Sequence, residues 1–287
     1  ILMYTLLKKN KIYSITLFVI LLIACFTFYS LFFFDANFKR KSLVSIESIS
    51  YNENEYENFV KTVNQGSNFI NNLPIIAHAG GGYKNLTYTN SIDTLEFNKN
   101  NYDLFELDFF LTDDGKLVCA HDWSENLKSF DKFELYINKK DDFKPCTYKS
   151  LLNWLSLNPK KRIVTDFKND NISGLTFIAE NFYNFEKIFI PQIYNPKEYE
   201  EVKNIGFENV IWTLYRYNKN NKAVLKYSKK MDLFAITMPQ DRAQSELPRL
   251  LKKEKIKTYV HTINSMEEYF IYLNHYEIDQ IYSDFIN

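Results

Sequence analysis

Short apolar runs recur along the chain from residue 75 onward, and stretches with the spacing of amphipathic helices separate them. Each run is rich in β-branched or aromatic residues and has the length of a β-strand. Their recurrence predicts one α/β domain over residues 74–287. The expected strands are Ile75–His78, Leu104–Phe110, Leu117–His121, Ile163–Phe167, Ile188–Gln192, Val210–Leu214, Leu233–Thr237, Thr258–Thr262 and Gln280–Asp284.

The third run cannot be a parallel neighbour of the second. Only residues 111–116 separate the two runs, whereas a parallel crossover needs about a dozen residues or more. Within this gap Asp114-Gly115 is a hairpin turn signal. We therefore expect Leu117–His121 to return antiparallel, as an arm beside Leu104–Phe110.

The eight remaining runs are mostly spaced as βα units. The exception is the interval from Asp108 to Asp166, which holds the hairpin and a helix expected near Tyr148–Leu157. Eight such units predict a (β/α)8 TIM barrel with the hairpin arm at its catalytic face. The alternative, a doubly wound open sheet, would show G-x-G-x-x-G after its first strand. The stretch from His78 to Gly82 is Gly-rich but lacks that spacing.

A different pattern occupies the N-terminal part of the chain. Ile12–Phe34 is a run of apolar residues without a charge, long enough as a helix to cross a hydrocarbon core of about 30 Å. We expect residues 1–11 to be a cytoplasmic tail, 12–34 a transmembrane signal-anchor and 35–73 a linker. A lipoprotein signal ending before Cys25, or a plain cleaved signal, remains open. All three place the barrel outside the cytoplasm, on the periplasmic or outer-surface side of a bacterial membrane.

The amino-acid composition limits the partners that we expect for this protein. The chain has 35 basic and 35 acidic residues, so charge gives no reason to expect nucleic acid. Its three cysteines lack metal-ligand spacing. Cys25 lies in the apolar run, which leaves at most one disulfide in the folded part, and we expect Cys119 to be a small buried side chain. Nothing in the sequence indicates an oligomeric state.

Polar residues stand at the ends of the expected strands, where a TIM barrel gathers its chemistry on one face. Buried charge is costly unless it is paired or bound to a metal ion, so this placement points to a site. The hairpin arm adds His121. The strand-end residues are His78, Glu106, Asp108, Asp166, Lys168, Gln192, Thr213, Thr237, His261 and Asp284.

Paired carboxylates suggest the chemistry. Glu106 and Asp108 share one strand face, so they must share a proton, pair with Lys168 or bind a cation. With Asp166 they offer an all-carboxylate set, which suits Mg²⁺ or Ca²⁺ better than zinc. A cation flanked by His78 and His121 suits cleavage of a phosphodiester by acid–base catalysis.

An ordered set of motifs over residues 74–287 resembles the glycerophosphodiester phosphodiesterase family, in the barrel superfamily that includes phosphatidylinositol-specific phospholipases C. The resemblance implies that Glu106, Asp108 and Asp166 bind the metal, that His78 and His121 are the acid/base pair, and that Lys168 lies near the phosphate. It also implies that a substrate hydroxyl attacks phosphorus. The motifs are Ile76-Ala77-His78-Ala79-Gly80, Thr89-Asn90-Ser91, Phe105-Glu106-Leu107-Asp108, Thr112 to Val118, His121-Asp122, Thr165-Asp166-Phe167-Lys168, His261-Thr262-Ile263-Asn264 and Ile281-Tyr282-Ser283-Asp284.

The chain departs from the family pattern at three places. It has His-Ala-Gly for His-Arg-Gly, Thr-Asn-Ser for Glu-Asn-Thr, and Asp166 where glutamate is commoner. We hypothesise that Arg216 replaces the missing phosphate-binding arginine, and we expect Asn90, Gln192 and His261 to contact substrate as well, although Gln192 could simply be a strand-end hydrogen bonder.

The resulting expectation is a metal-dependent enzyme that hydrolyses glycerophosphodiester-type small molecules, lipid remnants or polymers. Two alternatives remain open at this stage. One is cleavage of phospholipid itself, in the manner of phospholipases C or D. The other is a non-catalytic barrel that binds a phosphorylated glycan or lipid.

Overall fold

The computed structural model describes residues 74–122, 128–134 and 143–285. The predicted tail, signal-anchor and linker lie outside the described residues. Among the described residues, no helix combines the length and the apolar character that crossing a membrane requires.

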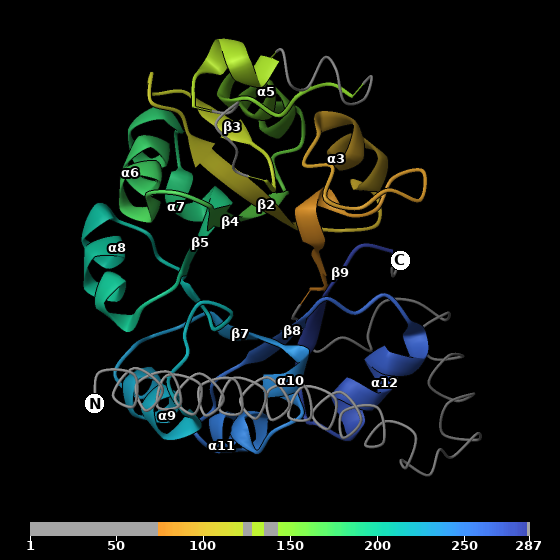
Figure 1. The fold of residues 1–287 in the computed structure, drawn as a ribbon, viewed down its shortest axis with the longest axis vertical. Coiled ribbons are helices and arrows are strands. Elements are labelled where there is room, and N and C mark those ends of the chain that lie inside the picture. Colours follow the sequence, from red (N-terminus) through yellow and green to blue (C-terminus); the bar gives the residue numbers. More distant parts are fainter. Residues whose placement is uncertain (1–73, 123–127, 135–142, 286–287) are drawn as a thin grey trace, which may run out of the picture. The chain divides into compact units, whose positions relative to one another are not determined.

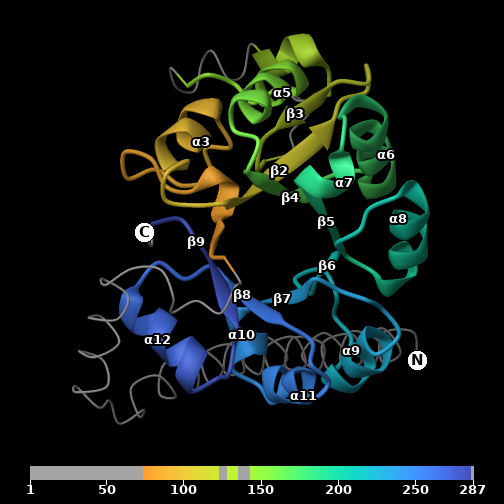
Figure 2. The ribbon, with the colours of Figure 1, turned by 180° about the vertical axis from the view of Figure 1, so that it is seen from behind.

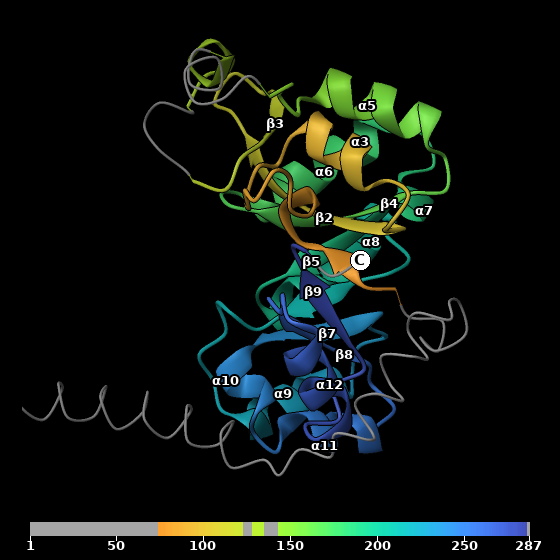
Figure 3. The ribbon, with the colours of Figure 1, turned by 90° about the vertical axis from the view of Figure 1, so that its right-hand side faces the viewer.

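Eight parallel strands close into a barrel. Neighbouring strands pair in the order β1-β9-β8-β7-β6-β5-β4-β2, and an additional pairing of β1 with β2 closes the ring, as Figures 1 and 2 show from the front and from behind. Figure 3 shows β1 and β9 side by side. The predicted TIM barrel is therefore confirmed. Its strands are β1 (Ile76–Ala77), β2 (Leu104–Leu111), β4 (Arg162–Phe167), β5 (Phe189–Ile193), β6 (Ile211–Thr213), β7 (Ala235–Pro239), β8 (Thr258–His261) and β9 (Gln280–Ser283).

The hairpin arm is also confirmed. Strand β3 (Leu117–Cys119) runs antiparallel to β2, with Phe110 opposite Val118. The turn closes through the Thr112 N–H, which donates to the Lys116 carbonyl at 2.9 Å, and Gly115 takes a left-handed φ of 70°. Glycine adopts this conformation without steric cost, which explains the Asp-Gly signal.

Helices cover the outside of the ring (Figure 1). Most begin at a polar residue whose side chain accepts a backbone N–H, as Ser91, Asp170 and Ser265 do. Thr147 and Ser150 form a reciprocal capping box at the start of α5. The described helices are η1 (His78–Gly80), α3 (Ile92–Asn98), α5 (Tyr148–Leu157), α6 (Asn171–Asn181), α7 (Phe185–Ile188), η3 (Pro196–Glu198), α8 (Tyr199–Ile205), α9 (Asn221–Ser228), α10 (Gln240–Ala243), α11 (Leu247–Lys253) and α12 (Met266–Asn274).

The barrel interior is filled by its own apolar layer. One buried cluster draws a single residue from each of the eight barrel strands, separate from the larger core between strands and helices. Such a layer makes the barrel a packed core rather than a pore, so a site in the barrel lies at one of its two ends. The layer consists of Ile76, Leu104, Val164, Ile190, Ile211, Ala235, Tyr259 and Tyr282.

Candidate active site

The site residues form the next layer of the barrel interior. Side chains of a strand alternate between its two faces, so a residue two positions after an interior residue again points inward. Two positions after the eight apolar layer residues, the sequence has only polar side chains. In strand order they are His78, Glu106, Asp166, Gln192, Thr213, Thr237, His261 and Asp284.

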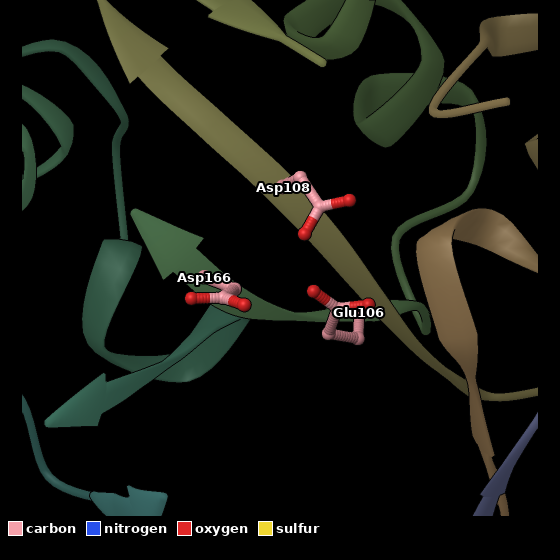
Figure 4. A group of neighbouring side chains, drawn as sticks. All are labelled: Glu106, Asp108 and Asp166. Carbon is pink, nitrogen blue, oxygen red and sulfur yellow. The ribbon is translucent and has the colours of Figure 1, made fainter. Parts of the chain in front are cut away.

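Three carboxylates come together on one side of this layer. Glu106 and Asp108 on β2 and Asp166 on β4 place oxygen atoms within 4.8 Å of one another, and their side chains converge in Figure 4. All three residues are buried. Burial, together with the charge of Asp108, raises the pKa of Glu106 well above its usual range. The buried surroundings therefore disfavour a further negative charge in the group of three carboxylates.

Asp108 is held in place by Asn90. The Asn90 side-chain amide donates to Asp108 Oδ2 at 2.8 Å, and the Asp108 N–H donates to Asn90 Oδ1 at 2.9 Å. Asn90 has a left-handed φ of 48°, a conformation that asparagine tolerates better than most residues. Although Asn90 was predicted to contact substrate, the structure commits its amide to Asp108.

Lys168 contacts two of the carboxylates. Its Nζ lies 2.5 Å from Asp108 Oδ1 and 2.7 Å from Asp166 Oδ2. The sequence left open whether the carboxylates pair with Lys168 or bind a cation, and the structure shows the pairing with Lys168. Glu106 instead accepts the Ala79 N–H at 2.8 Å. The backbone of Ala79, which stands where the resemblance led us to expect arginine, thus contacts the acidic group.

His78 stands beside the acidic group and is oriented from the far end of the chain. Its Nδ1 lies 2.9 Å from Asp284 Oδ1, and Asn264 donates to the other oxygen of Asp284 at 2.8 Å. Burial acts to lower the pKa of His78, but the bond to Asp284 and the charge of Glu106 outweigh it and raise the pKa to about 9.

His121 reaches the same cavity from the hairpin arm. The Ala120 N–H donates to the Asp108 carbonyl at 2.9 Å, which ties the end of the arm to β2. The Tyr88 ring contacts both histidines, with its centroid 4.7 Å from that of His78 and 4.3 Å from that of His121. Both imidazoles therefore pack against the same aromatic ring.

The arm is also covalently fixed. Cys119, two residues before His121, forms a disulfide with Cys146, and their Cα atoms are 5.2 Å apart. Both cysteines are buried, so the expectation of a small buried side chain at Cys119 is correct. Its disulfide is the single one that the cysteine count allowed in the folded part.

These residues surround one cavity of about 190 Å³. Its far side is made by Gln192, Thr213 and His261, from β5, β6 and β8. The Nδ1 of His261 lies 3.1 Å from Thr237 Oγ1, and burial lowers the pKa of His261 to about 4, so its imidazole is neutral. The complete lining is His78, Tyr88, Glu106, His121, Asp166, Lys168, Gln192, Thr213, Tyr215, His261 and Tyr282.

Solved structures with this barrel are similar to the chain. A Thermotoga maritima glycerophosphodiester phosphodiesterase has a TM-score of 0.59 at 18% identity over 76% of this chain and 96% of that one. An Oleispira antarctica phosphodiesterase in complex with the product sn-glycerol-3-phosphate has a TM-score of 0.55 at 14% identity, over 74% of this chain and 93% of that one. The chain has the fold of the glycerophosphodiester phosphodiesterases. No family model and no curated protein matches its sequence.

The resemblance seen in the motifs is thus confirmed at the level of the fold. A glycerophosphodiester phosphodiesterase from Parabacteroides distasonis adds a TM-score of 0.57 at 18% identity over 74% of this chain and 92% of that one. Of the predicted site residues, the structure brings seven into the cavity lining: His78, His121, Glu106, Asp166, Lys168, Gln192 and His261.

The structure also places Arg216 differently from its predicted role at the phosphate. Its guanidinium donates to the Phe167 carbonyl at 3.3 Å and lies over the rings of Tyr194 and Tyr215 instead of lining the cavity. Arg216 lies in the turn after β6, past the last strand residue Thr213, so its direction is set by its contacts with Tyr194 and Tyr215 and not by strand alternation. Its role as a phosphate ligand stays a prediction, and this geometry does not favour it.

The sequence interpretation missed Tyr88 and Tyr194. Tyr194 follows Gln192 by two residues, so continuing the alternation past the strand end would have found it. Tyr88 lies in the loop between β1 and α3 with a left-handed φ of 56°, and no residue pattern signals its position.

Proposed function

We propose that the chain is a divalent-cation-dependent phosphodiesterase that cleaves glycerophosphodiester-type substrates. One observation carries the proposal: the barrel gathers three buried carboxylates and two histidines around a single cavity. Few arrangements place that much buried charge together without a cation or a reaction to use it.

The acidic group fits a hard divalent cation. Lys168 and His78 are the positive side chains that contact Asp108, Asp166 and Asp284, so ionised carboxylates outnumber their cationic partners among the described residues of the site. Glu106, Asp108 and Asp166 would hold Mg²⁺ or Ca²⁺ through oxygen, the ligand atom both ions prefer. When bound, such an ion neutralises the charge of the phosphate.

The two histidines then move protons. A substrate hydroxyl next to the phosphate forms a bond to phosphorus as the bond to the departing alcohol breaks. One imidazole accepts the proton of the attacking hydroxyl, and the other gives a proton to the leaving oxygen. Added positive charge at the carboxylates would offset the negative charge of Glu106, which helps to raise the pKa of His78 to about 9. The pKa of His78 would then move toward neutrality, where an imidazole both accepts and donates a proton readily.

A hydrolysis assay tests the function. Glycerophosphocholine, which carries a hydroxyl next to its phosphodiester, is offered to the purified protein with EDTA and after Mg²⁺ or Ca²⁺ is returned. We expect turnover that EDTA abolishes and one of the two ions restores. Activity that ignores EDTA contradicts the proposal. Binding of diesters without turnover favours the non-catalytic barrel, and faster cleavage of intact phospholipid favours the lipase alternative.

We also propose that the barrel acts outside the cytoplasm, anchored by residues 12–34. The Cys119–Cys146 disulfide supports this, because disulfides persist in oxidising compartments and are rare in the cytosol. Maleimide labelling of cells lysed directly into denaturant tests it: Cys119 and Cys146 should resist labelling until a reductant is added. Labelling of both cysteines in the denatured protein without reductant contradicts an extracytoplasmic location.

A further inference from the structure

The carboxylate of Asp166 is surrounded by donors that come from outside the acidic group. Its Oδ2 accepts from Lys168 at 2.7 Å. Its Oδ1 accepts from the Tyr215 hydroxyl at 2.9 Å, and the Tyr194 hydroxyl also donates to it. Among the described residues, Tyr194 and Tyr215 therefore hydrogen-bond to Asp166 and not to the other two carboxylates.

Arg216 holds the two tyrosines together. The guanidinium carbon lies 4.1 Å from the centroid of the Tyr194 ring and 5.1 Å from that of Tyr215, and the two rings meet edge to face at 5.8 Å. Stacking of a guanidinium on aromatic faces is favourable. Arg216 also donates to the carbonyl of Phe167, the residue after Asp166, so the cluster is anchored to β4 itself.

Both hydroxyls donate to the carboxylate of Asp166. A neutral phenol that donates to a carboxylate stabilises its ionised form and restricts its rotation. Such partners of a ligating carboxylate are a main determinant of cation affinity.

We propose that Tyr194, Tyr215 and Arg216 are positioning residues that orient Asp166 as a ligand of the divalent cation. The inference rests on the proposed cation site and assigns Arg216 a role through the tyrosines rather than on the phosphate. It also accounts for an aspartate at this position, because donors on two sides hold the short side chain in one orientation.

Titration of the metal-stripped protein with Mg²⁺ or Ca²⁺ in a calorimeter tests the inference. Tyr194→Phe removes one hydroxyl and keeps the ring, and we expect cation affinity to fall by about 10–100-fold. Arg216→Ala should weaken binding in the same direction. KM for a diester at saturating cation should stay unchanged in both variants. The matched controls are Tyr183→Phe and Arg249→Ala, whose side chains are exposed, and both should bind like wild type.

The outcomes separate this inference from the proposed function. Unchanged cation affinity in Tyr194→Phe, with wild-type binding intact, overturns the inference alone. A raised KM in Arg216→Ala with unchanged cation affinity also overturns it and makes Arg216 a phosphate ligand. Weakened cation binding in a protein that cleaves no diester supports the inference and overturns the function. Absence of cation binding by wild type overturns both.

Discussion

Replacing His78 by alanine lowers kcat for a glycerophosphodiester by about 10²–10⁴-fold, the usual contribution of a positioned acid or base. The residue has no role in the apolar layers below it, and its imidazole is bonded to Asp284 at 2.9 Å. Since that bond fixes the ring, Asp284→Asn should lose part of the same activity. Steady-state kinetics at saturating cation measure both effects.

The control for His78 is His275, an exposed histidine after α12 that packs on Tyr276. His275→Ala should keep wild-type kcat. The thermal unfolding midpoint of His78→Ala should stay close to that of wild type, which separates lost chemistry from lost fold. Equal kcat in the two histidine variants would remove His78 from the reaction.

Removing the disulfide destabilises the protein by about 3–4 kcal/mol, the loop-closure entropy expected for a loop of this size. The two cysteines are separated by 27 positions. Urea unfolding of a Cys119→Ala, Cys146→Ala double variant, compared with wild type, measures the difference in the free energy of unfolding. The free energy of unfolding of wild type treated with dithiothreitol should approach that of the variant. Dithiothreitol reduces the disulfide to two thiols and is itself oxidised to a cyclic disulfide.

The same substitution has an effect on catalysis. His121 lies two residues past Cys119. Between these two residues, the Ala120 N–H donates to the Asp108 carbonyl and so holds the end of the arm to β2. We therefore expect kcat to fall in conditions where the double variant is still folded, with little change in cation affinity. A kcat equal to that of wild type in the folded double variant would show that the cross-link does not position His121.

Much of the barrel and its polar layer follows from simple alternation. The apolar runs predicted the strands and the polar residues at their ends, and the structure shows that at each barrel strand one of these lies two positions after a residue of the apolar layer, as in Val164 followed by Asp166. Because alternation is a local property of an extended backbone, it can be derived without knowing the fold. The hairpin was predictable for the same kind of reason, since six intervening residues permit no crossover.

Contacts between distant segments were not predictable in this way. Arg216 lies close to a strand end, and its sequence position alone suggested a phosphate ligand. Whether its guanidinium turns toward the cavity depends on Tyr194, which belongs to another βα unit. Likewise, the pairing of Asn90 with Asp108 depends on a loop in which Asn90 adopts a left-handed backbone. No period in the sequence encodes such loop conformations.

The bond between His78 and Asp284 has a consequence for the biosynthesis of the protein. These residues are 206 positions apart, and each directly follows one of the first and last strands of the ring, β1 and β9, which pair with each other. A nascent chain that has not yet emerged as far as β9 has neither the closing strand nor the carboxylate that orients His78. If the proposed reaction holds, the protein can therefore become active only after β9 has been synthesised, and proteolysis that removes β9 would take away the partner of His78 while leaving Glu106, Asp108 and Asp166 in the chain.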